Sequence, residues 1–221
     1  SPVTHAQLLN AISMRAKDEA LRLLASDSSL CQAAIEPSAL LQALYQRMPS
    51  VAAEIANRRT DLSVFEAAAI GATDRLEALL NSDPLLAKAF SLDGFTALHL
   101  ACFFGHAASV RALLASGAAA EAISRNAMMV RPIHSAASSD SIDIVAHLLQ
   151  SGADPDARQA MGFTPLHAAA LHGNVALVRL LVGAGADRYA KADDGRDAMA
   201  LAAEEGHDDV LAELEAIDQE A

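Results

Sequence analysis

The chain has 221 residues, of which 52% are hydrophobic and 4% aromatic, and it carries a net charge of −12. Enough apolar material is present to build a core, which argues against disorder, and the excess of carboxylates disfavours binding to a phosphate backbone. Alanine and leucine dominate while strand-forming residues are sparse, so an all-α fold is predicted. No apolar run is long enough to span a bilayer, so membrane insertion is not expected.

Residues 1–60 show a weak helical pattern. Segment 23–30 is similar to segment 79–86, since both have a leucine pair, a Ser-Asp pair and further apolar residues. Two more apolar stretches follow at about 40–48 and 51–56, separated at Pro49. We interpret this part as two degenerate helical pairs that continue the stack predicted below. An unrelated N-terminal helical cap is the alternative.

A repeat with a period near 33 residues begins after residue 60. The sequence Gly-Phe-Thr-Ala-Leu-His-Leu-Ala at 94–101 returns as Gly-Phe-Thr-Pro-Leu-His-Ala-Ala at 162–169, and weaker copies lie at 64–71, 131–137 and 195–203. Each copy continues with an amphipathic stretch, and several then end in Gly-Ala. The pattern predicts a helix, a reversal, a second helix and a loop in each unit. The expected units are 61–93, 94–126, 127–161, 162–194 and 195–221.

This pattern resembles the ankyrin repeat family over residues 61–221. The resemblance implies stacked helix-turn-helix units with protruding β-turn fingers, and therefore an ankyrin-repeat solenoid with a degenerate helical N-terminal part. Stacking is also required physically, because a single helical pair cannot bury its apolar faces alone.

The third copy departs from the pattern. Met129 stands where the second copy has Gly94, and Arg131 stands where it has Thr96. Asp140 replaces the glycine of the reversal, where Asp tolerates a left-handed backbone better than most residues. The loop before His134 is two residues longer than the loop before His167. A deformed finger is expected there.

Recurring histidines raise the question of a metal site. His99, His134 and His167 occupy equivalent positions in copies that would lie roughly 10 Å apart, the spacing of packed helices. Zinc ligands must converge at about 2 Å, so these residues form a ladder and not a cluster. The family resemblance implies that each hydrogen-bonds a turn. His106, His172 and His207 lie near the helix reversals and are expected to be surface residues.

Chemistry-bearing motifs are missing from the sequence. It contains no nucleophile elbow, phosphate-binding loop or zinc-protease motif. We therefore expect no catalytic residue, no cofactor and no metal, and we do not expect an enzyme. Cys31 and Cys102 lie among apolar neighbours and are expected to be core thiols, which fits a cytoplasmic location. A removed signal peptide would leave no trace here.

A partner surface is predicted from the positions that the repeat leaves free. The resemblance implies that partners dock on the finger tips and on the groove-facing side of the first helices. Four of the six phenylalanines fall at such positions, and aromatic and Met residues are enriched in interface cores. The predicted partner-binding residues are Phe95, Phe103, Phe104, Met128, Val130, Met161, Phe163, Leu171, His172 and Arg196.

The resulting hypothesis is an apolar concave groove over 94–172 that becomes acidic toward residue 205. It predicts a protein-binding scaffold or adaptor whose partner presents an apolar helix or extended segment with basic flanks. Two alternatives concern the surface: the phenylalanines pack as core, or the chain self-associates. Two others concern the function: a regulatory subunit of an enzyme, or a carrier of a small apolar ligand.

Overall fold

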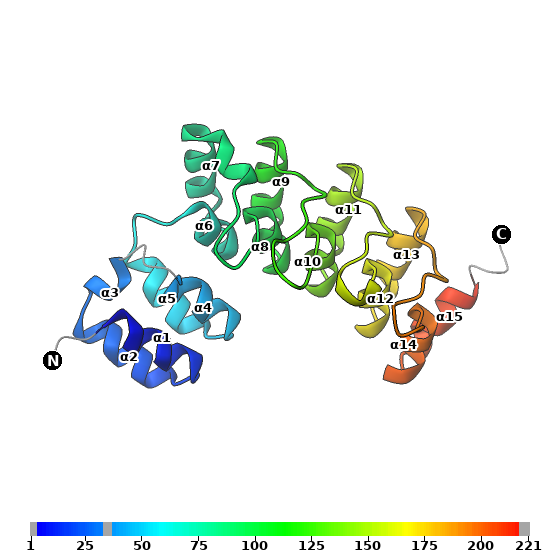
Figure 1. Cartoon of the computed structure of the whole chain (residues 1–221), viewed down its shortest axis with the longest axis horizontal. Helices are drawn as coiled ribbons and strands as arrows, with labels where there is room; N and C mark the ends of the chain where they lie inside the picture. The colour runs from blue at the N-terminus through cyan, green and yellow to red at the C-terminus, as the bar shows by residue number, and fades with distance from the viewer. Residues whose placement is uncertain (1–3, 33–36, 217–221) are drawn as a thin grey trace.

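The described residues of this computed structural model, 4–32 and 37–216, form seven antiparallel helix pairs (Figure 1). The first helix of each pair is called the inner helix below. The pairs are α1 (His5–Ser13) and α2 (Lys17–Ser26), α4 (Ala39–Tyr45) and α5 (Pro49–Asn57), α6 (Val64–Ile70) and α7 (Thr73–Ser82), α8 (Ala97–Phe103) and α9 (Ala107–Ala115), α10 (Pro132–Ser138) and α11 (Ile142–Gln150), α12 (Pro165–Leu171) and α13 (Val175–Gly183), and α14 (Ala198–Glu205) and α15 (Asp208–Ala216).

The remaining helical elements are short and lie in the connections. They are α3 (Ser29–Gln32), η1 (Pro84–Lys88) and η2 (Ala160–Gly162). Extended pairing within the described part is limited to one isolated bridge between Phe90 and Thr96. The all-α expectation is therefore confirmed.

One reversal geometry closes all seven pairs. A residue with positive φ follows each inner helix, and the next residue donates its backbone N–H to an alanine carbonyl five positions earlier. This arrangement satisfies carbonyls that the end of a helix leaves open. The seven accepting alanines are Ala11, Ala43, Ala67, Ala101, Ala136, Ala169 and Ala202. All seven are buried, so the reversal and the core share the same residue.

The left-handed position is not always glycine. Asp140 adopts φ 53°, which confirms the expectation that Asp replaces the glycine in the third copy. Arg15 and Arg47 adopt φ 54° and 56° at the same point of the two N-terminal pairs. The first two pairs therefore share the local geometry of the clear repeats, although their sequences hide it.

Helix starts are set by capping residues and prolines. The Ser63 hydroxyl accepts from the Glu66 N–H, and the Glu66 carboxylate accepts from the Ser63 N–H, which forms a capping box at α6. Pro49, Pro132 and Pro165 occupy the first positions of α5, α10 and α12, where their missing N–H has no cost.

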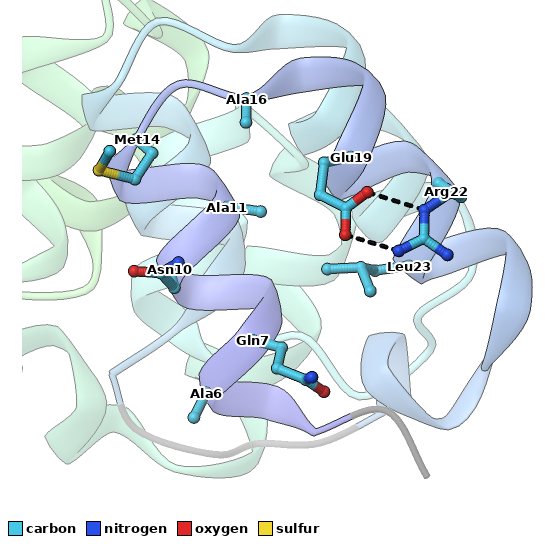
Figure 2. A pocket seen from close by; sticks show the side chains of 9 residues that line it. All are labelled: Ala6, Gln7, Asn10, Ala11, Met14, Ala16, Glu19, Arg22 and Leu23. Carbon is cyan, nitrogen blue, oxygen red and sulfur yellow. Dashed lines mark hydrogen bonds and ion pairs between the residues drawn. The ribbon is translucent and has the colours of Figure 1, made fainter. Parts of the chain in front are cut away.

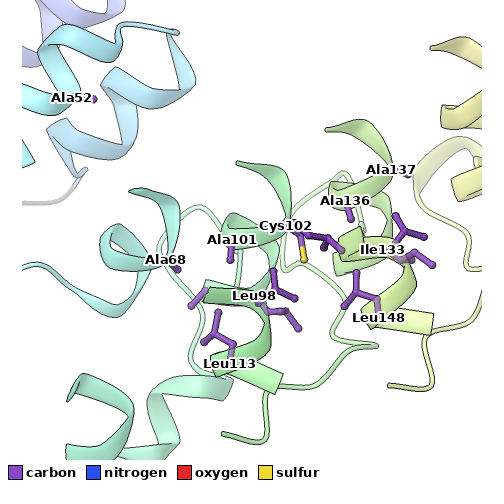
Figure 3. Packing of buried hydrophobic residues seen from close by; sticks show 14 of the residues in the cluster. Ala52, Ala68, Leu98, Ala101, Cys102, Leu113, Ile133, Ala136, Ala137 and Leu148 are labelled. Atoms are coloured by element: carbon purple, nitrogen blue, oxygen red, sulfur yellow. The ribbon is translucent and has the colours of Figure 1, made fainter. Parts of the chain in front are cut away.

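The core is a continuous seam between neighbouring pairs. Each inner helix from α4 onward contacts the next inner helix, and from α7 onward each outer helix contacts the next outer helix. Figure 3 shows Leu98 and Cys102 of one pair close to Ile133 and Ala136 of the next. These side chains are fully or almost fully buried, as is Cys31, and both cysteines are free thiols. Burial raises the pKa of both thiols, so the two cysteines act as core residues, as expected.

A buried ion pair joins the N-terminal pairs to the rest of the array. Arg59 Nη1 lies 2.5 Å from Glu66 Oε1, and the two side chains are 3% and 4% exposed. Ser38 Oγ donates to the same carboxylate oxygen over 2.7 Å, and Asp61 binds Arg59 Nε from the surface. Ser38 precedes α4 while Glu66 lies in α6, so this network fixes the position of the second pair against the third.

Candidate functional site

Four fingers project from one edge of the array. Each finger is closed by a backbone hydrogen bond between its two limbs, from residue 91 to 95, 124 to 130, 159 to 163 and 192 to 196. Neighbouring fingers are also bonded, because Arg125, Ala160 and Asp193 donate their N–H groups to the carbonyls of Gly94, Met128 and Met161. The finger tips therefore form a connected edge and not four independent loops.

The second finger is longer than the others, as its sequence predicts. Its limbs close over residues 124–130, whereas the other three each span five residues. Asn126 organises the extra length by donating to the Asp93 carbonyl over 2.9 Å and accepting from the Met128 N–H over 3.1 Å. Met129 adopts φ 50° where the first finger has Gly94 at 85°.

The ladder histidines tie each inner helix to the loop or finger that leads into the next helix pair. The Thr96 N–H donates to His99 Nδ1 at 3.2 Å, which leaves Nε2 to donate to the Val130 carbonyl at 3.0 Å. His134 and His167 bond in the same way to the carbonyls of Ala157 and Arg196. Burial lowers the pKa of His99 and of His134 to about 4, so both rings are neutral at pH 7.

No group of three or more His, Cys, Asp or Glu side chains in residues 4–32 and 37–216 is placed to hold a metal ion. The ladder histidines use both ring nitrogens for hydrogen bonds, as the family resemblance implies. Their role in this structure is to fasten an inner helix to the loop or finger that leads into the next helix pair.

The other histidines behave differently from one another. His106 and His207 are half-buried, and their Nε2 atoms bond to the carbonyls of Ala69 and Leu171 in the preceding repeat. The expectation that these two are surface residues is wrong, because each ring packs over a glycine of the preceding reversal. His172 is exposed and contacts the Asp140 carboxylate at 3.2 Å.

A groove runs along the inner helices behind the fingers. It consists of two hollows of about 460 and 210 Å³ that share His134, Ser138 and Gln159 in their walls. The first hollow is lined by Gln42, Tyr45, Asp93, Phe95, His99, Leu100, Phe103, Met128, Val130, His134, Ser135, Ser138 and Gln159. The second adds Met161, Phe163, Thr164, Ala168, Leu171 and His172.

A third hollow, of about 370 Å³, lies on the other side of Phe103. Its walls include Tyr45 and Phe104 together with the residues that join α4 to α5. Phe103 contributes to both this hollow and the first hollow of the groove, and its side chain is 46% exposed. It therefore stands as a ridge between two depressions.

Nine of the ten predicted partner-binding residues line these three hollows. Four are exposed: Phe103, Met128, Met161 and His172. Four are half-buried: Phe95, Phe104, Phe163 and Leu171. Phe95 and Phe104 pack against a small core cluster of Leu41, Ala69 and Leu100, so for these two the alternative of a packing role is partly correct.

Two of the ten residues are less available than the sequence suggested. Val130 lines the first hollow but is only 5% exposed, and its carbonyl accepts from His99. Arg196 lies outside the groove and is held by the carboxylates of Asp194 and Glu204 at 2.7 and 2.8 Å. Neither side chain is presented freely in the way that the sequence suggested.

Sequence reasoning missed the contribution of α4. Tyr45 stacks on Phe104 with ring centroids 5.9 Å apart, and its hydroxyl donates to Asp93 Oδ2 over 2.7 Å. Burial, with a smaller contribution from the Asp93 carboxylate, raises the pKa of the Tyr45 hydroxyl. The one feature of the sequence that could have drawn attention to Tyr45 is that aromatic residues make up only 4% of the chain.

The concave surface changes character toward the C-terminal end. Exposed carboxylates follow the second hollow on the fourth finger and at the end of α14, namely Asp193, Asp194, Glu204 and Glu205. Arg196 is bonded to two of them. None of the four carboxylates lines the two hollows of the groove.

Another hollow, about 690 Å³ and larger than those of the groove, lies between α1 and α2 (Figure 2). Its walls carry mostly small and polar side chains and no aromatic ring. Its charged residues, Glu19 and Arg22, are bonded to each other within one helix turn and are solvent-exposed. This hollow offers neither an aromatic anchor nor an uncompensated charge, so the groove is the better candidate site.

Comparison with known families agrees with the architecture. The family model described as ankyrin repeats in three copies matches residues 64–159 and 133–219. No curated protein matches the chain. Among the described helices, none has the length and apolar character that crossing a membrane requires.

Proposed function

The chain belongs to the ankyrin repeat family, whose repeats are generally protein–protein interaction modules, and on this premise we propose that it captures an apolar segment of another protein along its groove. The proposed role is that of a scaffold or adaptor. No catalytic step is assigned to the chain, and its ladder histidines are already engaged in structural hydrogen bonds.

The observation that carries this proposal is the exposure of large apolar side chains along one concave face. Phe103, Met128 and Met161 are 46%, 55% and 69% exposed, and all three line the groove. The helical repeat does not require apolar side chains at these positions. Contiguous apolar patches on soluble proteins commonly mark interaction sites, and Phe and Met are enriched in interface cores.

The shape and charge of the groove indicate the kind of segment that fits. A trough bounded by helices on one side and fingers on the other suits an amphipathic helix or an extended strand. The exposed carboxylates beyond the second hollow favour basic residues at one end of that segment. The proposed partner is thus apolar at its centre and basic at its flank.

The two N-terminal pairs are proposed to be degenerate repeats of the same array and part of the same surface. Their reversals match those of the later pairs, with Arg15 and Arg47 at the left-handed position. The inner helix α4 contacts both α1 and α6. It also places Gln42 and Tyr45 in the wall of the first hollow.

Selection of peptides from a random phage library of about twelve residues tests the proposal. Enriched peptides should bind the whole chain in fluorescence polarisation, and Phe103→Ser should weaken that binding at least about tenfold because it removes an exposed anchor. Leu85→Ser is the matched control, since Leu85 is 76% exposed but lines none of the three hollows. Phe104 is avoided because it packs against Tyr45.

Three results would overturn the proposal. The library yields no specific binder, or every selected peptide binds Phe103→Ser as tightly as the unaltered chain. Equal losses in Phe103→Ser and Leu85→Ser, with unchanged melting of both, would also separate binding from the groove.

A small apolar ligand is the second candidate occupant. The first hollow, at about 460 Å³, falls within the usual size range of small-molecule sites and has mostly apolar walls. Native mass spectrometry of purified protein would then show a retained metabolite or lipid that is lost in Phe103→Ser. Native mass spectrometry also shows whether the chain self-associates. If the partner protein proves to be an enzyme, the chain would be its regulatory subunit. We place the protein in the cytoplasm in this proposal, since its cysteines are free thiols.

A further inference from the structure

The first hollow of the groove contains a carboxylate with no cationic partner in its walls. Asp93 Oδ2 accepts from the Tyr45 hydroxyl, and Asp93 Oδ1 accepts from the Ser91 hydroxyl. Both donors are neutral. No Lys or Arg is among the described residues that line this hollow.

The two histidines of the same walls add no positive charge. His99 and His134 are buried and hydrogen-bonded, and burial holds the pKa of each at about 4. The side-chain charge lining the hollow at pH 7 is therefore the single negative charge of Asp93. A cationic group is the complement of that charge, and an anionic group would be repelled.

Several polar side chains in the walls of the same hollow have unused hydrogen-bonding capacity. Gln42, Ser135, Ser138 and Gln159 line the hollow, and their side chains make no hydrogen bond to the described part of the chain. Amide and hydroxyl oxygens accept hydrogen bonds. The walls therefore suit a ligand group that carries several N–H donors.

Aromatic and thioether groups make up the apolar part of the walls. The rings of Tyr45, Phe95 and Phe103 and the side chain of Met128 line the same hollow as Asp93. The whole chain has only six Phe and two Tyr residues, so three of these rings at one hollow is a marked concentration. Aromatic faces attract cations, and arginine more often than lysine occupies such places.

We propose that the first hollow binds the guanidinium group of an arginine in the partner segment. A guanidinium is planar, positively charged and weakly hydrated, stacks on aromatic rings and offers five N–H donors. These properties match the rings, the carboxylate and the free acceptors of this hollow together. A lysine ammonium is compact and strongly hydrated, so it fits the apolar walls less well. This inference rests on the proposed protein-binding function and adds the identity of one anchor.

The test uses the peptides selected above. In a bound peptide, arginine is replaced by citrulline, which keeps the shape and removes the charge. Affinity for the unaltered chain should fall about tenfold or more, because the charge-assisted contact with Asp93 is lost. When the protein carries Asp93→Asn, replacing arginine by citrulline should lower the peptide's affinity by about threefold at most, since the carboxylate is then already absent. The amide of this variant retains an oxygen that can accept from Tyr45, and melting curves check that the variant folds.

Control measurements locate the effect. Glu205→Gln removes an exposed carboxylate at the acidic end of the array, and the ratio of arginine to citrulline affinities should stay as in the unaltered chain. A peptide with dimethyl-lysine in place of arginine should bind more weakly than the arginine peptide.

Each contrary result has a defined meaning. Failure to select any peptide overturns the proposed function itself. Peptides that depend on Phe103 but contain no required arginine, or bind equally with citrulline, overturn only the arginine site. Tighter binding of the dimethyl-lysine peptide also overturns it, in favour of an alkylammonium site. An undiminished citrulline effect in Asp93→Asn overturns the role given to Asp93.

Discussion

The Tyr45 hydroxyl lies 2.7 Å from Asp93 Oδ2, and this hydrogen bond joins helix α4 to the first finger across 48 residues of sequence. The ring of Tyr45 also stacks on Phe104 at the end of α8. Through these two contacts the N-terminal pairs close one end of the groove. The proposed binding surface is therefore shared between the part that matches the family model and the part that precedes it.

Tyr45→Phe should lower the stability of the chain by about 1 kcal/mol or less, because it removes one hydrogen bond while the exposed Asp93 remains hydrated. Tyr45→Ala should cost more, about 2–4 kcal/mol, since the stacking on Phe104 is lost and a cavity is left. Urea unfolding followed by circular dichroism measures both. Equal losses in the two variants would show that the ring contributes nothing beyond its hydroxyl.

Acidification should destabilise the array through its ladder histidines. Burial lowers the pKa of His99 and His134 from 6.5 to about 4 in the folded chain, so the unfolded chain binds more protons between these values. The free energy of unfolding should thus keep its full value above pH 6.5 with respect to these histidines. It should fall as the pH drops toward 4, by about 3 kcal/mol at most for each histidine. The urea midpoint measured from about pH 7.5 to 4 reports this slope.

The same experiment on His134→Gln isolates one contribution. That variant should be less stable at pH 7, because the Ala157 carbonyl loses its donor, yet its midpoint should depend less on pH. If the slopes of the variant and the unaltered chain coincide between pH 6.5 and 4, His134 is not a source of the acid sensitivity.

Glu66→Gln should destabilise the chain by about 3–5 kcal/mol, because it leaves the guanidinium of Arg59 buried without its main counter-charge. The double variant Arg59→Met with Glu66→Gln should recover part of this loss, since no buried charge remains. Glu19→Gln, which breaks the exposed pair with Arg22, serves as the control and should cause no measurable change. A double variant less stable than Glu66→Gln would contradict this account.

Alanine substitutions at two glycines distinguish the cost of a strained backbone from the cost of a steric clash. Gly173 and Gly206 have φ 69° and 74°, but a Cβ on Gly173 would lie 2.7 Å from His207 Nδ1, whereas one on Gly206 would meet nothing within 4 Å. Gly206→Ala should therefore cost about 1 kcal/mol, the penalty of a left-handed backbone. Gly173→Ala should cost clearly more and should weaken the bond from His207 to Leu171. Thermal melting compares them, and equal losses would show that the ring simply moves aside.

Much of the fold follows from local pattern in the sequence. The period of the histidines predicts the stacking, the apolar stretches around Pro49 predict α4 and α5, and Asp140 predicts a left-handed reversal that the structure contains. These features are readable because each repeat uses the same local contacts, so the same residue types return at the same spacing.

The site was predictable only in part. The free positions of the repeat indicated the concave face, and most of the named residues lie on it. Val130 lines the first hollow but is only 5% exposed, which its place in the repeat did not reveal. The proposed arginine site could not have been named, since Gln42, Asp93 and Gln159 come from three different units.

The sequence by itself determined the repeat, the helices and the surface on which variable residues gather, because these depend on contacts within one unit and between units of the same pattern. Only the tertiary structure decided the Arg59–Glu66 pair, the Tyr45–Asp93 bond and the hollow that Tyr45 and Asp93 line together. Each of these brings together residues that no periodic rule connects, and their meeting depends on how the degenerate N-terminal pairs pack against the first clear repeat.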